Sequence, residues 1–213
     1  MGAPLQTRGR LITVEGIDGA GKSTQVARLA AVLERHGYRT VTTREPGGTP
    51  MGETLRRLLL ETDLPLAPEA ELLLFLADRA QHVASVIKPA LADGVIVLCD
   101  RFSDSTIAYQ GYGRERDVAD VRRWDAESRD GIEADLTILL DCPVAVALSR
   151  LSRPDDRYQA LDTSFHERVR AGFLALAAAA PDRIHRVDAG GDVDAVSTEV
   201  GRVALARLGE WRL

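Results

Sequence analysis

The chain has little lysine and cysteine, few aromatic residues and no asparagine. Its two cysteines, Cys99 and Cys142, lie far apart inside or at the end of apolar runs, so we expect buried free thiols in a reducing compartment. No apolar run reaches the roughly 18 residues that a membrane-spanning helix needs, and residues 1–10 lack the apolar stretch of a secretion signal. These absences predict a cytoplasmic protein without a disulfide or a membrane partner.

The 213 residues include 27 basic and 32 acidic side chains, which gives a net charge of −5. This acidic balance disfavours a protein that coats nucleic acid, because such binding rests on excess basic charge. With 45% hydrophobic and 28% charged residues the chain is able to bury a sizeable core, so we expect residues 1–213 to form one domain. Arginine supplies nearly all the positive charge, since Lys22 and Lys88 are the two lysines.

Short β-rich runs alternate with longer helical patterns along the chain. This alternation is typical of a parallel sheet covered by helices on both faces, so the sequence predicts an α/β fold with five strands. The predicted strands are residues 11–15, 40–44, 95–100, 136–141 and 184–187. Apolar residues at helical spacing predict helices between the first two strands, where Gly37 ends the pattern, over 69–91, and around 165–176.

Residues 16–23 read Gly-Ile-Asp-Gly-Ala-Gly-Lys-Ser and match the phosphate-loop pattern G-x-x-x-x-G-K-[ST] between a predicted strand and a predicted helix. Glycines allow a tight turn that points backbone N–H groups at phosphate oxygens, and the helix dipole adds positive potential. Lys22 would reach the β- and γ-phosphates of ATP, and Ser23 would ligate Mg²⁺. The expected ATP-binding residues of this loop are Gly16, Ile17, Asp18, Gly19, Ala20, Gly21, Lys22, Ser23 and Thr24.

Charged side chains follow the next two predicted strands at the same edge of the sheet, where open α/β folds bind their ligands. Arg44 ends the second strand before a Glu-Pro-Gly-Gly turn, and it is a candidate phosphate ligand. Asp100 follows the apolar third strand, as a carboxylate ligand of Mg²⁺ would. Arg101 comes next, and its guanidinium is able to bind phosphate through two N–H groups.

A phosphate loop alone leaves three classes open: a nucleotide switch, an ATP-driven motor and a kinase for a small acceptor. Guanine-specific switches commonly read the base with an Asn-Lys-x-Asp segment, which a chain without asparagine cannot supply. A motor would usually need a longer chain and a basic or partner-binding surface. The sequence therefore favours a kinase, and Phe75 and Arg79, four residues apart on one helix face, are candidates for its acceptor pocket. Further candidates, after the metal position, are Ser105, Tyr109 and Gln110.

Several segments spread along almost the whole chain form a recognisable set. They are VEGIDGAGKST from Val14, REPGGT from Arg44, FLADRAQH from Phe75, DRFSDSTIAYQG from Asp100, LTILLDC from Leu136 and DDRYQALDTSFHERVRAGF from Asp155. In these segments the chain closely resembles the thymidylate kinase family, the dTMP kinases of the nucleoside monophosphate kinase group. The resemblance implies the phosphate-loop nucleoside monophosphate kinase fold, a cytoplasmic homodimer, and ATP-dependent phosphorylation of dTMP to dTDP for dTTP synthesis.

The resemblance also implies roles for the acceptor residues. Phe75 would lie against the thymine ring, and Arg79 would bind a base carbonyl. Ser105 and Gln110 would approach the base as well. Tyr109 would fill the space beside the sugar where a ribose 2′-hydroxyl would project, which would exclude ribonucleotides.

Further roles follow from the same resemblance for the charged residues. Asp18 would face the sugar 3′-hydroxyl and the metal region. Arg44 and Arg101 would bind the acceptor phosphate, with Arg101 also near the transferred group. Residues 150–164 would form a lid over ATP. The lid arginines are Arg150, Arg153 and Arg157.

Three positions depart from the family pattern. Gly19 stands where some relatives have a phosphate-loop arginine, so we expect the lid to supply the catalytic cation, as in bacterial-type members. Gln159 stands where members often have an acidic residue, which weakens any role for a lid carboxylate. Phe102 replaces a frequent Tyr or His, which we interpret as a change in packing.

A deoxynucleoside kinase is the alternative function. Its acceptor is a neutral hydroxyl that needs a general base, and Glu45 at the end of the second strand is the candidate. A phosphate monoester needs no base, because with a second pKa near ~6 it is mostly dianionic at neutral pH. The pair of Arg44 and Arg101 favours an acceptor that already bears a phosphate.

Overall fold

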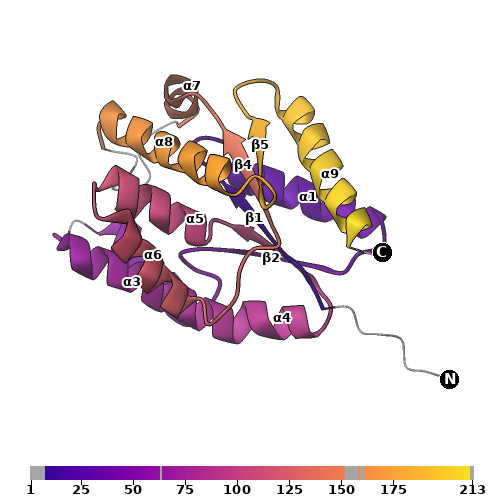
Figure 1. Cartoon of the computed structure of the whole chain (residues 1–213), viewed down its shortest axis with the longest axis horizontal. Coiled ribbons are helices and arrows are strands. Elements are labelled where there is room, and N and C mark those ends of the chain that lie inside the picture. The colour runs from indigo at the N-terminus through magenta and orange to yellow at the C-terminus, as the bar shows by residue number, and fades with distance from the viewer. Residues whose placement is uncertain (1–7, 63, 152–157, 159–160, 212–213) are drawn as a thin grey trace.

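The computed structural model describes residues 8–62, 64–151, 158 and 161–211, which form a parallel sheet covered by helices (Figure 1). The strands are β1 (Leu11–Glu15), β2 (Thr40–Arg44), β3 (Ile96–Asp100), β4 (Leu136–Asp141) and β5 (Ile184–Asp188). Their order across the sheet is β2-β3-β1-β4-β5, and every neighbouring pair runs parallel. The predicted five-stranded sheet is confirmed, and β3 and β5 each differ from their predicted bounds by one residue at one end.

Burial separates the central strands from the edge strands. All residues of β1 and β4 are buried, and β3 is buried up to its last residue, Asp100. Strands covered by helices on both faces need apolar side chains at nearly every position, which explains their continuous apolar runs. The edge strands β2 and β5 are partly exposed. The phosphate loop therefore follows, and Asp100 ends, a strand that is buried in the core.

Helices lie on both sides of the sheet, with α1 and α9 together on one side and α8 and α5 on the other (Figure 1). They are α1 (Lys22–Arg35), α2 (Pro50–Arg56), α3 (Pro68–His82), α4 (Lys88–Ala92), α5 (Ser103–Thr106), α6 (Val118–Ser128), α7 (Val144–Ser149), α8 (Thr163–Ala179) and α9 (Val193–Glu210). Wider π-helical turns are η1 (Arg57–Glu61), η2 (Val83–Ile87) and η3 (Ile107–Gly113). Among the described residues, no helix is both long and apolar enough to cross a membrane.

The predicted helix over 69–91 is helical along its length but is not one regular helix. It consists of α3, the π-helical turn η2 and α4. Pro89 lies at the start of α4 and has no N–H to donate, so the regular hydrogen-bond ladder cannot continue through it. Other local predictions are confirmed: Gly37 follows α1 with a φ of 81°, and Cys99 and Cys142 are buried free cysteines.

Candidate active site

The carboxyl ends of the strands border one large cavity of about 710 Å³. The predicted residues that line it are Asp18 to Thr24 of the phosphate loop, Arg44, Phe75, Arg79, Asp100, Arg101, Ser105, Tyr109, Gln110 and Arg150. The fold thus brings together segments that are far apart in the sequence. The predicted lid residues Arg153 and Arg157, and the departing position Gln159, lie outside the described residues.

The phosphate loop turns sharply between β1 and α1 because its glycines adopt positive φ angles. Gly16, Gly19 and Gly21 have φ values of 141°, 78° and 92°. A Cβ atom on Gly19 would lie 2.1 Å from the carbonyl oxygen of Ala147, so a side chain has no room there. Since α1 begins directly after Gly21, the free N–H groups of its first turn border the cavity, as an anion site requires.

Lys22 is buried at the start of α1, and its Nζ donates a hydrogen bond to the carbonyl oxygen of Ile17 at 2.8 Å. Burial and the charge of Arg101 lower the pKa of Lys22 to about 8. Ile17 and Gly16 lie behind the cavity lining, where the Ile17 side chain is buried in the core. Ile17 therefore contributes through its backbone, by holding the Lys22 ammonium in place.

The two predicted Mg²⁺ ligands meet at the cavity. The Ser23 hydroxyl of α1 donates to Oδ2 of Asp100 at the end of β3, over 2.5 Å. Both are hard oxygen donors, and both line the cavity. Within the part of the chain that the structure describes, no group of three or more His, Cys, Asp or Glu side chains is placed to hold a metal ion. An ion here would take its other ligands from phosphates and water, as Mg²⁺ usually does.

Asp18, Arg101 and Tyr109 form a polar cluster in the cavity. Nη2 of Arg101 donates to Oδ1 of Asp18 at 2.5 Å, and the Tyr109 hydroxyl donates to Oδ2 of Asp18 at 2.7 Å. The Arg101 guanidinium also lies over the Tyr109 ring, 4.9 Å from its centre. Although burial opposes ionisation, the charges of Arg101 and Lys22 lower the pKa of Asp18 to about 2. Asp18 is therefore a carboxylate throughout the physiological pH range.

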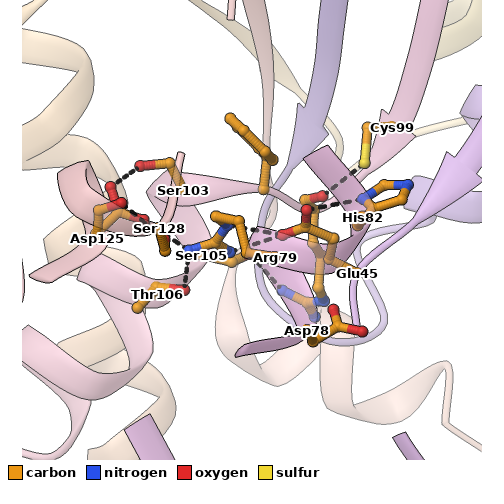
Figure 2. Close-up of polar contacts among 12 residues, drawn as sticks. Glu45, Asp78, Arg79, His82, Cys99, Ser103, Ser105, Thr106, Asp125 and Ser128 are labelled. Atoms are coloured by element: carbon orange, nitrogen blue, oxygen red, sulfur yellow. Dashed lines mark hydrogen bonds and ion pairs between the residues drawn. The ribbon is translucent and has the colours of Figure 1, made fainter. Parts of the chain in front are cut away.

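Arg79 is held between acidic side chains from other elements (Figure 2). Its Nε donates to Oε2 of Glu45 at 2.8 Å, and its Nη1 donates to Oδ1 of Asp125 in α6 at 2.6 Å. Nη1 also donates to the Thr106 hydroxyl at 2.8 Å. The Arg79 side chain is 2% exposed, yet it borders the cavity. The sequence selected Arg79 but missed Asp125, which belongs to no motif and lies 46 positions away.

Glu45, the candidate base of the alternative function, belongs to the same buried network (Figure 2). While Oε2 accepts from Arg79, Oε1 lies 2.8 Å from Nδ1 of His82. The other ring nitrogen of His82 lies 2.6 Å from the hydroxyl of Thr43. Both Glu45 oxygens are therefore engaged, and the geometry does not favour a role as general base.

Two side chains that were predicted to approach a base donate hydrogen bonds to carboxylates instead. The Ser105 hydroxyl donates to Oε2 of Glu15 at 2.5 Å, and Nε2 of Gln110 donates to Oε1 of Glu71 at 3.3 Å. Thr106, next to Ser105, was not selected, although its hydroxyl faces the buried guanidinium described above and it lines the cavity. Sequence spacing could not show which hydroxyl contacts Arg79, that of Ser105 or that of Thr106. The hydrogen bond from Ser105 to Glu15 sets the orientation of both.

Two arginines near β2 line the cavity, and the sequence predicted a role for one of them, Arg44, but not for the other, Arg56. Arg44 lines the cavity and pairs with Glu53 at 3.0 Å, with about half of its side chain exposed (51%). Arg56 of α2 also lines the cavity, and its Nη1 donates to the carbonyl oxygen of Pro46 at 3.0 Å. Arg56 lies in no motif, so its position in the sequence does not mark it as a cavity residue. Together they place two further guanidinium groups at the cavity near the carboxyl end of β2.

Arg150 directly follows α7 and lies at the start of the predicted lid. Its guanidinium crosses to the loop after β5, where it donates to the carbonyl oxygens of Ala189, Gly190 and Gly191 at 2.9, 3.1 and 3.2 Å. These contacts join Arg150, where the predicted lid begins, to the edge of the sheet, beside the cavity that both segments line.

The five-stranded parallel sheet, together with a phosphate loop on one wall of the cavity and aromatic and arginine side chains on another, is that of the phosphate-loop nucleoside monophosphate kinase fold. The family model described as thymidylate kinase matches residues 14–200. The chain therefore belongs to the thymidylate kinase family, and the resemblance noted from its motifs is confirmed.

Individual relatives agree with this assignment over nearly the full chain. The thymidylate kinase of Synechococcus sp. (strain JA-3-3Ab) is 52% identical over 197 residues, which cover 92% of this chain and 96% of the relative. That of Geobacter sulfurreducens is 48% identical over 209 residues, covering 94% and 98%. The crystal structure of thymidylate kinase from Ehrlichia chaffeensis superposes with a TM-score of 0.78 at 38% identity, covering 93% of this chain and 99% of that one.

Proposed function

We propose that the chain transfers the γ-phosphoryl group of ATP to dTMP and so produces dTDP, the reaction of the family to which it belongs. The observation that carries the proposal is the bridging position of Arg101. Its guanidinium donates to Asp18 in the phosphate loop and to the hydroxyls of Ser105 and Tyr109 on the acceptor side. From a position between the two sides of the cavity, an arginine would neutralise the charge that develops during phosphoryl transfer.

The acceptor end suits a deoxyribonucleotide with a thymine base. Phe75 offers a ring face, and Arg79 offers a guanidinium whose orientation two carboxylates fix. Tyr109 lies against Asp18 and Arg101, so its ring has little freedom to yield to a 2′-hydroxyl. We expect base contacts from Arg79 and Gln110, with Thr106 joining Ser105 beside the base.

Catalysis in this site needs no general base. The phosphate of dTMP is mostly a dianion at neutral pH, so its oxygen is already a nucleophile. The protein's task is to hold two anions in line and to neutralise their charge, which falls to Lys22, Arg44 and Arg101. Lys22 is suited to this role because phosphates next to its ammonium favour the charged form and oppose the effect of burial. Arg153 and Arg157 of the lid would add charge near the γ-phosphoryl group.

The donor set fits Mg²⁺ as the partner of ATP. Ser23 and Asp100 present a hydroxyl and a carboxylate oxygen that already lie within hydrogen-bond distance of each other. Mg²⁺ commonly uses one or two protein oxygens together with substrate phosphates and water. When bound there it would neutralise charge on the phosphates, while Ser23 and Asp100 fix its place at the carboxyl end of β3.

We further propose a homodimer in the cytoplasm. The support for a second copy as partner is the family resemblance together with large apolar side chains at the surface, such as Leu73 of α3, which is 54% exposed. The two buried free cysteines suit a reducing compartment. Light scattering during size-exclusion chromatography would test the dimer, and a Leu73→Arg variant that stays dimeric would argue against this face.

The test of the activity is ADP release in a coupled assay with ATP, Mg²⁺ and a panel of acceptors: dTMP, dUMP, dCMP, dAMP, UMP and thymidine. We expect dTMP to be far ahead. Phe75→Ala should raise KM for dTMP and leave KM for ATP nearly unchanged, whereas Lys22→Ala should mainly lower kcat. If thymidine were phosphorylated and dTMP were not, the proposal would be refuted and the deoxynucleoside kinase would be the favoured function.

A further inference from the structure

Glu15 is a buried carboxyl group to which the proposed reaction gives no role. It ends β1 directly before the phosphate loop and is 0% exposed. Its Oε1 accepts a hydrogen bond from the Phe102 N–H at 2.7 Å, and its Oε2 accepts from the Ser105 hydroxyl at 2.5 Å. Both partners belong to the segment that follows β3. Glu15 therefore ties the end of one central strand to the residues around Arg101.

The backbone of Arg101 lies in the left-handed region, with a φ of 70°. Residues other than glycine rarely adopt this conformation, and it persists where the surroundings determine it and where function requires it. The next peptide N–H, that of Phe102, is the one that Glu15 accepts. The hydrogen bond therefore fixes the chain at the point where it leaves the left-handed residue.

Glu15 also supports the guanidinium of Arg101 through an intervening hydroxyl. Nη1 of Arg101 donates to Oγ of Ser105 at 3.1 Å, while that hydroxyl gives its own proton to Glu15. Nη1 also donates to the carbonyl oxygen of Gly16, the residue after Glu15, at 3.1 Å. The same strand end thus holds Arg101 by its backbone and by its side chain.

The arrangement does not depend on one protonation state of Glu15. Burial and the neighbouring Asp104 raise the pKa of Glu15 to about 8. Both the acid and the carboxylate accept the Phe102 N–H, and both share a proton with the Ser105 hydroxyl. The support of Arg101 is therefore present on both sides of neutral pH.

We propose that Glu15 is a positioning residue for phosphoryl transfer, which holds Arg101 in the conformation that directs its guanidinium at Asp18 and the phosphates. The proposal rests on the proposed function, in which Arg101 binds the acceptor phosphate and the transferred group. Glu15 is not among the residues that line the cavity, and it would act through the Phe102 N–H and the Ser105 hydroxyl.

Two substitutions of Glu15 separate positioning from packing. Glu15→Leu removes both acceptors at similar volume, and a misplaced Arg101 should lower kcat roughly 10-fold or more while KM for ATP changes less than about twofold. Glu15→Gln keeps an acceptor for the Phe102 N–H and should recover kcat to within about threefold of wild type. Asp141→Asn is the matched control, because Asp141 is a buried carboxylate at the end of β4 that holds Arg170 at 2.7 Å. It should keep kcat within about twofold.

The decisive measurement is the coupling between Glu15 and Arg101. In an Arg101→Ala background, Glu15→Leu should lower kcat less than about twofold further, because the residue that it positions is gone. An equal loss of kcat in both backgrounds would reduce Glu15 to a structural residue and overturn the proposal, as would an unchanged kcat in Glu15→Leu.

If Glu15→Leu does not fold, Ser105→Ala is the variant to test, since it removes the hydroxyl that links Glu15 to the guanidinium and keeps the hydrogen bond from the Phe102 N–H. It should lower kcat in the wild-type background and not in Arg101→Ala, and an unchanged kcat in the wild-type background would overturn the proposal. Failure of the proposed function would be recognised separately, because the wild-type protein would then not phosphorylate dTMP at all.

Discussion

The buried charges around Arg79 allow a quantitative test by the substitution Asp125→Asn. Asp125 is 0% exposed and accepts hydrogen bonds from Nη1 of Arg79 at 2.6 Å, the Ser103 hydroxyl at 2.5 Å and Nε of Arg129 at 2.8 Å. Asparagine has nearly the same shape, but it replaces one acceptor oxygen by a donor and removes the negative charge. Arg79 would then be a buried cation with Glu45 as its remaining charged partner.

The expected loss is large because one partner of a buried ion pair is removed while the other stays. Such changes cost about 3–5 kcal/mol. For a chain of this length each kcal/mol lowers Tm by about 2–4 °C, so the melting temperature should fall by roughly 6–20 °C.

Asp120→Asn is the control on the same helix. Asp120 pairs with Arg123 at 2.8 Å, but their side chains are 56% and 66% exposed. Surface pairs of this kind contribute about 0–1 kcal/mol, because water screens the charges. The two variants make the same chemical change in α6 and differ in burial.

Urea denaturation followed by circular dichroism would measure both variants, and acceptor kinetics would follow on the folded proteins. Asp125→Asn should also raise KM for dTMP more than KM for ATP, since Arg79 is one of the residues proposed to bind the acceptor. Equal losses of stability in the two variants, or a loss below about 1 kcal/mol for Asp125→Asn, would refute the buried-pair reasoning.

Three further predictions concern the cavity. Gly19→Ala should lower the free energy of unfolding by about 1–3 kcal/mol more than Gly21→Ala, because both have positive φ but a Cβ on Gly19 would meet the Ala147 carbonyl whereas one on Gly21 meets nothing within 4 Å; similar losses in urea denaturation would contradict this. Burial and the nearby Glu45 raise the pKa of Asp78 to about 7. The folded state therefore binds an extra proton between about pH 4 and 7, and stability falls as pH rises through that window. Asp78→Asn should accordingly be more stable than wild type at pH 8 and lose that advantage near pH 4, and a constant difference across the range would contradict it. Tyr109→Ala should raise the ratio of ribo-TMP to dTMP phosphorylation and Tyr109→Phe should not, so an unchanged ratio in Tyr109→Ala would remove the steric explanation.

Local patterns were sufficient to predict the sheet and the phosphate side of the site. The central strands are apolar runs in the sequence because helices cover both of their faces. The phosphate loop is rich in glycine because its turn requires positive φ angles. Asp100 and Arg101 were selected because they follow the apolar run of β3, and both line the cavity. Each of these features is determined by a few consecutive residues of the sequence.

The contacts that orient the acceptor side could not be predicted in this way. Glu15 reads as a polar residue at a strand end, and its burial appears only when the segment after β3 folds over it. Asp125 reads as one of several acids on α6, and its contact with Arg79 depends on how α3 and α6 pack. A buried acid and an exposed acid have the same sequence signature, so these partners required the tertiary structure.

The distribution of partners in the cavity explains why the chain retains lysine at position 22 while arginine supplies most of its positive charge. Arg79 and Arg101 are both bound to carboxylates, which fix planar guanidinium groups in one orientation. Lys22 differs, since its Nζ donates to the carbonyl oxygen of Ile17, a neutral group. Burial and the charge of Arg101 lower the pKa of the Lys22 ammonium to about 8, and bound phosphates would restore its preference for the charged form. The guanidinium groups of Arg79 and Arg101 are therefore held in place by carboxylates without a bound nucleotide. The ammonium of Lys22 donates to no carboxylate of the residues that the structure describes, and it is available to pair with phosphates.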